Sequence, residues 1–225
     1  MKKEYIVKIL KTDYVTHDVK RFIVEKPKNY KFAPGQATEL SINLQDYKNE
    51  KRPFTFTSLN DNPNLEFIIK IYRDHESVTK KLEDLKQGDS FILRDIWGAI
   101  HYKGYGVFIA GGTGITPFIA ILRQLRKEKK LKGNILIFSN KTEKDIILKN
   151  EFDEMTKEGL QIVYTLTKEN NPKYENRHIN ESFLKEKITH FNQQFYICGP
   201  IKFVGEIQHT IQRLGAHPDA IVIET

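Results

Sequence analysis

Hydrophobic and polar residues follow two different patterns in the two halves of the chain. Up to about residue 103, short apolar stretches that favour β-structure alternate with turn residues. They predict strands at residues 5–10, 19–25, 37–44, 54–58, 65–72 and 90–93. One helix is expected near residues 78–85, ending at the Gly88 turn in the manner of a glycine C-cap. This spacing of short strands predicts a small antiparallel β-barrel.

From Tyr105 onward, apolar strands alternate with segments of helical period. The expected strands lie at 105–110, 134–139, 160–166, 194–198 and 220–224, and the expected helices at 116–130, 143–157, 180–189 and 202–214. This alternation predicts a doubly wound parallel sheet, and hence two domains, residues 1–103 and 104–225. Ligands of such sheets bind beyond the carboxyl ends of the strands, so the loops at 111–116 and 198–200 are candidate binding sites.

The composition narrows the classes of protein to which the chain can belong. Its 225 residues contain no apolar run near the roughly 18 residues of a membrane span. Residues 1–8 lack the apolar core of a signal peptide, so we expect a cytoplasmic location. The one cysteine, Cys198, excludes an internal disulfide and a cluster held by four thiolates. The seven histidines form no close metal-ligand pair, so no metal is expected.

The formal net charge is +7. The basic residues are interspersed with acidic ones, as in residues 123–130, and no nucleic-acid-binding motif accompanies them, so a nucleic-acid partner is not expected. A basic surface of this kind fits an acidic protein partner.

A glycine-rich run, Gly-Gly-Thr-Gly-Ile-Thr-Pro at 111–117, joins an apolar strand to an amphipathic helix. Glycine allows a sharp turn and a close approach to backbone N–H groups, and the helix adds partial positive charge, so an anionic ligand is expected there. Thr116 is the expected N-cap, with Pro117 at the first helical position. A plain strand-to-helix turn would also fit the run. Pro117 stands where the dinucleotide fingerprint has a third glycine or alanine, which disfavours a standard Rossmann dehydrogenase.

Four segments occur in an order and spacing that together resemble one family. They are Phe-Ala-Pro-Gly-Gln at 32–36, Arg-Pro-Phe-Thr-Phe-Thr-Ser at 52–58, Gly-Gly-Thr-Gly-Ile-Thr-Pro-Phe at 111–118 and Tyr-Ile-Cys-Gly-Pro at 196–200. The chain resembles the ferredoxin–NADP reductase superfamily over nearly its whole length; that superfamily includes cytochrome b5 reductases, flavodoxin reductases and flavin reductases. The resemblance implies a barrel that binds flavin, FAD rather than FMN, and a sheet that binds NADH or NADPH.

The resemblance places two segments of the barrel along the flavin. Arg52 would pair with a pyrophosphate, Phe54 would cover an isoalloxazine face, and Thr55 would bond the flavin edge near the reacting nitrogen. The further flavin-binding residues implied are Pro53, Ser58, Lys70, Tyr72, Ser77, Val78 and Thr79. Two departures stand beside these segments: His-Glu at 75–76 replaces a glycine, and Asp-Ile-Trp-Gly at 95–98 replaces a Gly-Pro-x-Gly turn. Without the other motifs, residues 52–58 would be read as an ordinary barrel strand.

In the second domain the resemblance places the pyridine nucleotide along two loops and a strand end. The implied residues are Gly112, Thr113, Gly114, Thr116, Ser139, Cys198, Gly199 and Pro200. Cys198 would face the nicotinamide, with a positioning role rather than a nucleophilic one. The stretch 138–146 looks like that of NADH-dependent cytochrome b5 reductases, which favours NADH. NADPH stays open, because four basic residues could each meet a 2′-phosphate: Lys141, Lys144, Lys168 and Arg177.

The resemblance implies hydride transfer from NAD(P)H to bound FAD and electron delivery to a separate ferredoxin, flavodoxin or haem protein. One alternative is an NAD(P)H:flavin reductase that uses free flavin as substrate, and another is a non-catalytic electron-transfer subunit. Residues 220–225 offer no aromatic side chain to stack on the flavin, so its nicotinamide-side face would be open, or covered by Tyr196 or Trp97.

Overall fold

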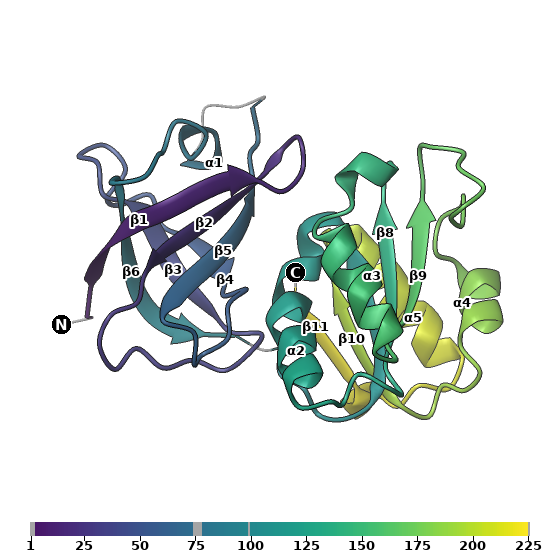
Figure 1. Ribbon diagram of the computed structural model, residues 1–225. Coiled ribbons are helices and arrows are strands. Elements are labelled where there is room, and N and C mark those ends of the chain that lie inside the picture. Colours follow the sequence, from purple (N-terminus) through teal and green to yellow (C-terminus); the bar gives the residue numbers. More distant parts are fainter. Residues whose placement is uncertain (1–2, 74–77, 99, 225) are drawn as a thin grey trace.

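The computed structural model describes residues 3–73, 78–98 and 100–224, so Ser77 and the replacement at 75–76 lie outside the described residues. Two bodies stand side by side, an antiparallel barrel and a parallel sheet covered by helices (Figure 1). The prediction of this two-part fold is confirmed. No helix in the described part of the chain is long and apolar enough to cross a membrane.

The barrel is a six-stranded sheet in the order β4-β3-β6-β1-β2-β5, with antiparallel pairing throughout. Its strands are β1 (Tyr5–Tyr14), β2 (Val19–Glu25), β3 (Ala37–Ile42), β4 (Arg52–Thr55), β5 (Asn64–Lys70) and β6 (Ser90–Trp97). The inner faces form one core in which Phe22, Phe56 and Phe67 are fully buried. Alternating burial along β2 reflects the period of two that places every second side chain inside.

Two barrel elements differ from the prediction. The strand expected at 54–58 is β4 at Arg52–Thr55, because the chain then leaves β3 and turns toward β5, where Thr57 N donates to Glu66 O at 3.0 Å. The helix expected at 78–85 is only α1 (Val78–Lys81). Beyond it the bonds tighten to i→i+3 turns, and the buried Lys20 ammonium binds the carbonyls that a longer helix would use: those of Leu82, Glu83 and Leu85.

The second sheet is parallel, in the order β11-β10-β7-β8-β9. Its strands are β7 (Gly106–Gly111), β8 (Ile135–Asn140), β9 (Gln161–Leu166), β10 (Gln194–Cys198) and β11 (Ile221–Glu224). Helices α2 (Thr116–Lys127) and α3 (Lys149–Lys157) pack on one face, and α4 (Glu181–Lys187) and α5 (Ile201–Arg213) pack on the other. The strand order reverses between β7 and β10, and this is where a doubly wound sheet opens for a ligand.

The start of α2 differs from the expected cap. A 3₁₀ turn, η1 (Gly112–Ile115), runs directly into the helix, so Ile115 is the N-cap and Thr116 is already helical. The Thr116 hydroxyl donates back to Thr113 O at 3.0 Å and caps no N–H group. The prediction of Thr116 as N-cap is therefore wrong, because the glycines let the chain begin to coil one turn earlier than the apolar period shows.

The helix predicted at 143–157 is divided in two. A 3₁₀ turn, η2 (Glu143–Asp145), begins with a capping box between Thr142 and Asp145, and α3 begins only at Lys149. Between them Ile146 and Ile147 are buried in the core, and Leu148 takes a left-handed φ of 53°. The continuous helical period therefore concealed a break.

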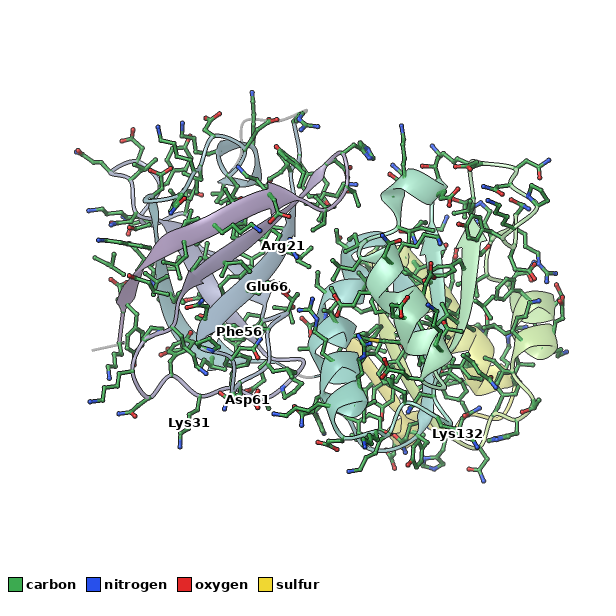
Figure 2. The ribbon with its side chains drawn as sticks, viewed as in Figure 1. Arg21, Lys31, Phe56, Asp61, Glu66 and Lys132 are labelled. Carbon is green, nitrogen blue, oxygen red and sulfur yellow. The ribbon has the colours of Figure 1, made fainter. Side chains whose placement is uncertain are left out.

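Helix α2 lies between the two sheets, facing the barrel (Figure 1). Val19 and Ile68 of the barrel belong to the same apolar cluster as Ile119 and Ile121 of α2. Arg123 of α2 also reaches the barrel, where its Nη1 lies 2.6 Å from Glu66 Oε1. Glu66, labelled in Figure 2, is on the side of the barrel that faces this helix. The contact places the end of β5 beside the glycine turn of the sheet.

Candidate functional site

A pocket between the barrel and the glycine turn collects most of the residues assigned to the flavin. We call it the barrel pocket. Its volume is about 240 Å³, and its lining is Pro53, Phe54, Thr55, Ile68, Ile69, Lys70, Tyr72, Thr79, Thr113 and Thr116. Strand β4, the end of β5 and the start of α1 supply the barrel side, while η1 and α2 supply the other. The sequence motif at 52–55 and the segment at 70–79 therefore meet in space, although they are distant in the chain.

A second pocket, which we call the sheet pocket, has a volume of about 360 Å³ and lies at the carboxyl edge of the parallel sheet. It contains six of the predicted residues: Lys70, Tyr72, Gly112, Thr113, Ser139 and Pro200. Its remaining lining is Asp18, Val19, Gly111, Asn140, Lys141, Asp145, Ile147, Thr167, His178 and Phe203. Lys70, Tyr72 and Thr113 line both pockets, so the two pockets adjoin.

The glycine turn packs too closely for any side chain. A Cβ on Gly114 would lie 2.2 Å from Cys198 O and 2.6 Å from Gly199 N, and a Cβ on Gly199 would lie 2.8 Å from the Phe203 ring. Gly112 has a φ of +55°, which side chains rarely adopt, and open space beside it. Gly114 and Gly199 therefore hold β7 and β10 together from behind, while Gly112 presents bare backbone to the sheet pocket.

Cys198 ends β10 directly opposite Glu224 of β11. Burial is the main cause that raises the pKa of its thiol to about 12, and the nearby Glu224 carboxyl adds to it. Burial also raises the pKa of Glu224, whose Oε2 has no hydrogen-bond partner among the described residues. The thiol is thus protonated at neutral pH, and an uncharged thiol at this position suits packing and positioning rather than nucleophilic attack.

Several predicted residues lie outside both linings as the structure describes them. Ser58 is buried, and its Oγ accepts a hydrogen bond from Glu66 N at 3.0 Å. The Val78 side chain belongs to the barrel core. Arg52 is exposed beside the barrel pocket and donates to Lys51 O at 2.7 Å. With only four residues in α1, the expected helix N-terminus for the flavin phosphates is not formed, and Ser58 and Val78 have structural contacts in place of the predicted ones.

Neither residue suggested to cover the flavin lies in these linings. Tyr196 has 0% exposure and stacks on Phe108, with ring centroids 4.4 Å apart. Its hydroxyl donates to Gly104 O at 2.8 Å and accepts from Lys103 N at 2.8 Å. The suggestion of Tyr196 is therefore wrong, because the ring is held in the core. Trp97 is 45% exposed at the end of β6, away from the described lining of either pocket.

Charged groups gather where the barrel meets the rim of the sheet pocket. Lys70 Nζ lies 2.6 Å from Asp18 Oδ2, and His17 Nε2 lies 3.7 Å from Asp145 Oδ1 across the two domains. Burial alone would raise the pKa of the Asp18 carboxyl, but the bond and charge of Lys70 outweigh it and lower that pKa. His17, Asp18 and Asp145 are close enough to share a cation, yet Lys70 already supplies the positive charge beside Asp18.

Of the four basic residues considered for a 2′-phosphate, Lys141 lines the sheet pocket. Arg177 is directed elsewhere, because its guanidinium pairs with Glu175 at 3.0 Å and with Glu186. Lys144 and Lys168 lie outside the described lining. Sequence reasoning missed Asp18, Asn140 and Phe203, which come from segments with no glycine or hydroxyl motif to mark them.

The donor set of the two pockets fits a flavin beside a pyridine nucleotide. The barrel pocket offers the Thr55 and Thr79 hydroxyls, the Lys70 ammonium and two aromatic rings, Phe54 and Tyr72. The sheet pocket offers bare backbone at Gly112 and a buried unpaired carboxamide at Asn140. An antiparallel barrel with the first set, joined to a doubly wound sheet with the second, defines the class of two-domain flavin and pyridine-nucleotide oxidoreductases.

Comparisons with known proteins agree with that class. Residues 7–102 match the oxidoreductase FAD-binding domain family, and residues 108–209 match the oxidoreductase NAD-binding domain family. The chain is 31% identical over 213 residues to NADH-cytochrome b5 reductase 2 of Debaryomyces hansenii, covering 86% of this chain and 70% of that protein. It is 30% identical over 213 residues to the protein of the same name from Candida albicans, covering 86% and 69%.

Two solved structures show the same fold. A ferredoxin NADP+ reductase from Neisseria gonorrhoeae with bound FAD and NADP superposes with a TM-score of 0.87 at 21% identity, covering 99% of this chain and 98% of that chain. The CS-b5R domains of human Ncb5or give a TM-score of 0.89 at 23% identity, covering 100% and 70%. The chain belongs to the ferredoxin–NADP reductase superfamily, and it is an FAD-containing, NAD(P)H-dependent oxidoreductase.

Proposed function

We propose that the protein is an NADH-dependent reductase that delivers electrons to a separate, acidic electron-carrier protein, with a haem protein of the cytochrome b5 type as the first candidate. The curated relatives described above are both named NADH-cytochrome b5 reductase 2. The net charge of +7 supports an acidic acceptor, because opposite charges speed the encounter of two proteins.

The contact between the two pockets is the observation that carries this proposal. Hydride transfer requires the two reacting rings to approach to roughly 3–3.5 Å. Lys70, Tyr72 and Thr113 line both pockets, so ligands held in the two pockets meet at these side chains. FAD supplies the conversion between a two-electron donor and one-electron acceptors.

The chain's own residues would bind, orient and exclude water. Thr55 would hold the edge of the flavin through its hydroxyl, and Tyr72 would separate the pockets until the nucleotide enters, as its 47% exposure permits. Cys198 would keep an uncharged wall behind the glycine turn, since its thiol stays protonated.

Spectroscopy of the purified protein tests the proposal. The protein is expected to show flavin absorption that bleaches anaerobically with NADH faster than with NADPH. Addition of a b5-type haem protein, a ferredoxin or a flavodoxin then identifies the acceptor, and the rate with an acidic acceptor should fall as salt is raised. Faster bleaching by NADPH, or equal slow rates with all three carriers, would contradict the proposal.

Use of free flavin as a substrate is the second candidate function. It is favoured by the brevity of α1, which has four residues and so presents no full helix terminus to the flavin phosphates, and by the exposure of Arg52. A protein that loses its colour on desalting, but oxidises NADH when FAD, FMN or riboflavin is added, would support this candidate. Retained colour after desalting would exclude it.

A further inference from the structure

Asn140 ends β8 at the floor of the sheet pocket. The residue is 5% exposed, and among the described residues neither its Oδ1 nor its Nδ2 has a hydrogen-bond partner. A buried carboxamide with both ends unpaired is rare, because burial removes its bonds to water without replacing them. An unsatisfied polar group that faces a pocket indicates a ligand that satisfies it.

The position of Asn140 is fixed by its backbone. Its carbonyl oxygen accepts from Thr167 N at 3.0 Å and from Thr167 Oγ1 at 3.3 Å, and the residue pairs with Leu166 of β9. The next turn is held by Thr142 N, which donates to Asp145 Oδ2 at 2.8 Å. The unpaired carboxamide is therefore a feature of a well-bonded strand end, and its place in the pocket follows from the register of β8.

The order of the strands assigns Asn140 to one end of the nucleotide. Lys70, Tyr72 and Thr113 mark the end of the sheet pocket that meets the barrel pocket, where a nicotinamide must lie to reach the flavin. Asn140 and Thr167 come from β8 and the residue after β9, on the side of β7 away from β10. The far end of a dinucleotide, its adenosine, would therefore lie over Asn140.

A carboxamide needs a partner that both donates and accepts. Phosphate oxygens only accept, so they would leave Oδ1 unpaired beside negative charge, and a ring face offers neither bond. A ribose with adjacent hydroxyls offers both. We propose that Asn140 binds the adenosine ribose of the pyridine nucleotide, with Oδ1 accepting from the 2′-hydroxyl and Nδ2 donating to the 3′-hydroxyl oxygen.

The assignment gives Asn140 a part in coenzyme selection, and it rests on the proposed use of NADH. In NADPH the 2′-hydroxyl hydrogen is replaced by a phosphate, which removes the group that Oδ1 would accept from and brings negative charge to that oxygen. The neutral side chain would then disfavour NADPH, while the exposed Lys141 beside it partly offsets the repulsion.

Equilibrium binding tests this proposal without use of turnover. Isothermal titration calorimetry on the flavin-loaded protein would compare NAD⁺, its 2′-deoxyadenosine analogue and NADP⁺. Wild-type protein should bind the deoxy analogue about tenfold more weakly than NAD⁺, the typical effect of one buried hydrogen bond. Asn140→Leu should weaken NAD⁺ binding by about tenfold and bring the ratio between NAD⁺ and the deoxy analogue close to one.

Asn140→Asp is the conservative variant, because a carboxylate also accepts from a ribose hydroxyl. It should keep the preference for NAD⁺ over the deoxy analogue and reject NADP⁺ more strongly than wild type does. Asn150→Leu, at an exposed site on α3, is the matched control and should bind all three ligands as wild type does. Flavin content and melting temperature would confirm that each variant is folded.

Two results would overturn the assignment: equal affinity of wild type for NAD⁺ and its deoxy analogue, or an Asn140→Leu protein that keeps the wild-type ratio. Either would leave the proposed function intact if NADH still bleaches the flavin. Conversely, wild-type discrimination that Asn140→Leu abolishes, in a protein whose flavin NADH does not reduce, would support the ribose site and refute the proposed function. Failure of wild type to bind NAD⁺ at all would refute both.

Discussion

The two pockets that meet at Tyr72 are built by different means. The sheet pocket owes its shape to backbone, since Gly112 presents bare peptide and Gly114 packs against the end of β10. The barrel pocket consists of side chains on β4 and beyond β5, several of them partly exposed. The difference indicates that substitutions in the glycine turn act by displacing whole strands, whereas substitutions in the barrel remove single interactions.

The largest effect is expected from Gly114→Val. The new Cβ would lie 2.2 Å from Cys198 O, which is backbone at the end of a buried strand and cannot move aside cheaply. Overpacking of this kind costs about 1–3 kcal/mol, so the KM for NADH should rise by about tenfold or more, with flavin content unchanged. Steady-state kinetics with NADH as the varied substrate would measure it.

Gly112→Ala is the control within the same turn. Its Cβ meets nothing within 4 Å, so the cost is limited to the φ of +55°, about 1 kcal/mol. An unchanged KM in Gly114→Val, or a larger effect in Gly112→Ala, would contradict the view that close packing shapes the sheet pocket.

The next effect concerns the joint between the two regions. Arg123 donates through Nη1 to Glu66 Oε1 at 2.6 Å and to Thr57 O at 2.8 Å, and through Nε to Glu151 Oε1 at 2.6 Å. Burial opposes the charge of Arg123, but the two carboxylates outweigh it and raise its pKa. Arg123→Met would leave Glu66 buried without its cation. The free energy of unfolding should fall by about 3 kcal/mol, the lower end for a broken buried pair, because the guanidinium is slightly exposed.

Denaturant unfolding measures this change, and Arg126→Ala provides the comparison. Arg126 is one turn further along α2 and pairs with Glu158 at the surface, where such pairs contribute about 0–1 kcal/mol. Similar losses of stability in the two variants would show that the Glu66–Arg123–Glu151 network is no stronger than a surface pair.

The parallel sheet was predictable because its strands and helices have different periods that survive in the sequence. β10 agrees with its predicted bounds, and the order of strands and helices after Gly106 is as expected. The break before α3 was not predictable, because Ile146 and Ile147 continue the apolar pattern while entering the core. Thr116 shows the same limit at a helix start, since glycines before it allowed a 3₁₀ turn that no period records.

The candidate site was predictable where a motif marks it and not where two domains meet. Thr55 and Thr113 were expected near ligands and line the barrel pocket. Ser58 belongs to the same motif, yet it is turned inward to Glu66 N as the chain leaves β4. Asn140 carries no motif, and only the register of β8 and its lack of partners reveal it.

Arg52→Ala tests the barrel pocket through a single side chain. Arg52 makes only an exposed pair with Glu50 and a bond to the neighbouring Lys51 O, so its removal costs the fold little. If it binds the flavin pyrophosphate, the lost charged hydrogen bonds of about 1.5–3 kcal/mol should weaken FAD binding by roughly tenfold to a hundredfold. Flavin retained after dialysis reports it, and Lys51→Ala is the control. Equal retention in both variants would remove Arg52 from the flavin site.

The smallest effect is expected at Cys198. Cys198→Ala should leave the flavin bound and slow its reduction by NADH only modestly, since the thiol contributes packing rather than charge. The folded protein should also resist iodoacetamide near neutral pH, because the reactive species is the thiolate and the pKa is raised to about 12. Rapid labelling of the folded protein would contradict this environment.

The same thiol should affect stability only in alkali. Its pKa rises from 9.0 to about 12 on folding, so above about pH 9 the unfolded chain loses a proton that the folded chain keeps. The unfolded state then binds fewer protons, and the free energy of unfolding falls as the pH rises from about 9 toward 12. Wild type should therefore lose more stability than Cys198→Ala between about pH 8 and about pH 10, while buried tyrosines such as Tyr30 contribute equally to both proteins. Parallel pH profiles for the two proteins would mean that the thiol is solvated, and that this end of β10 is more open than the packing around Gly114 indicates.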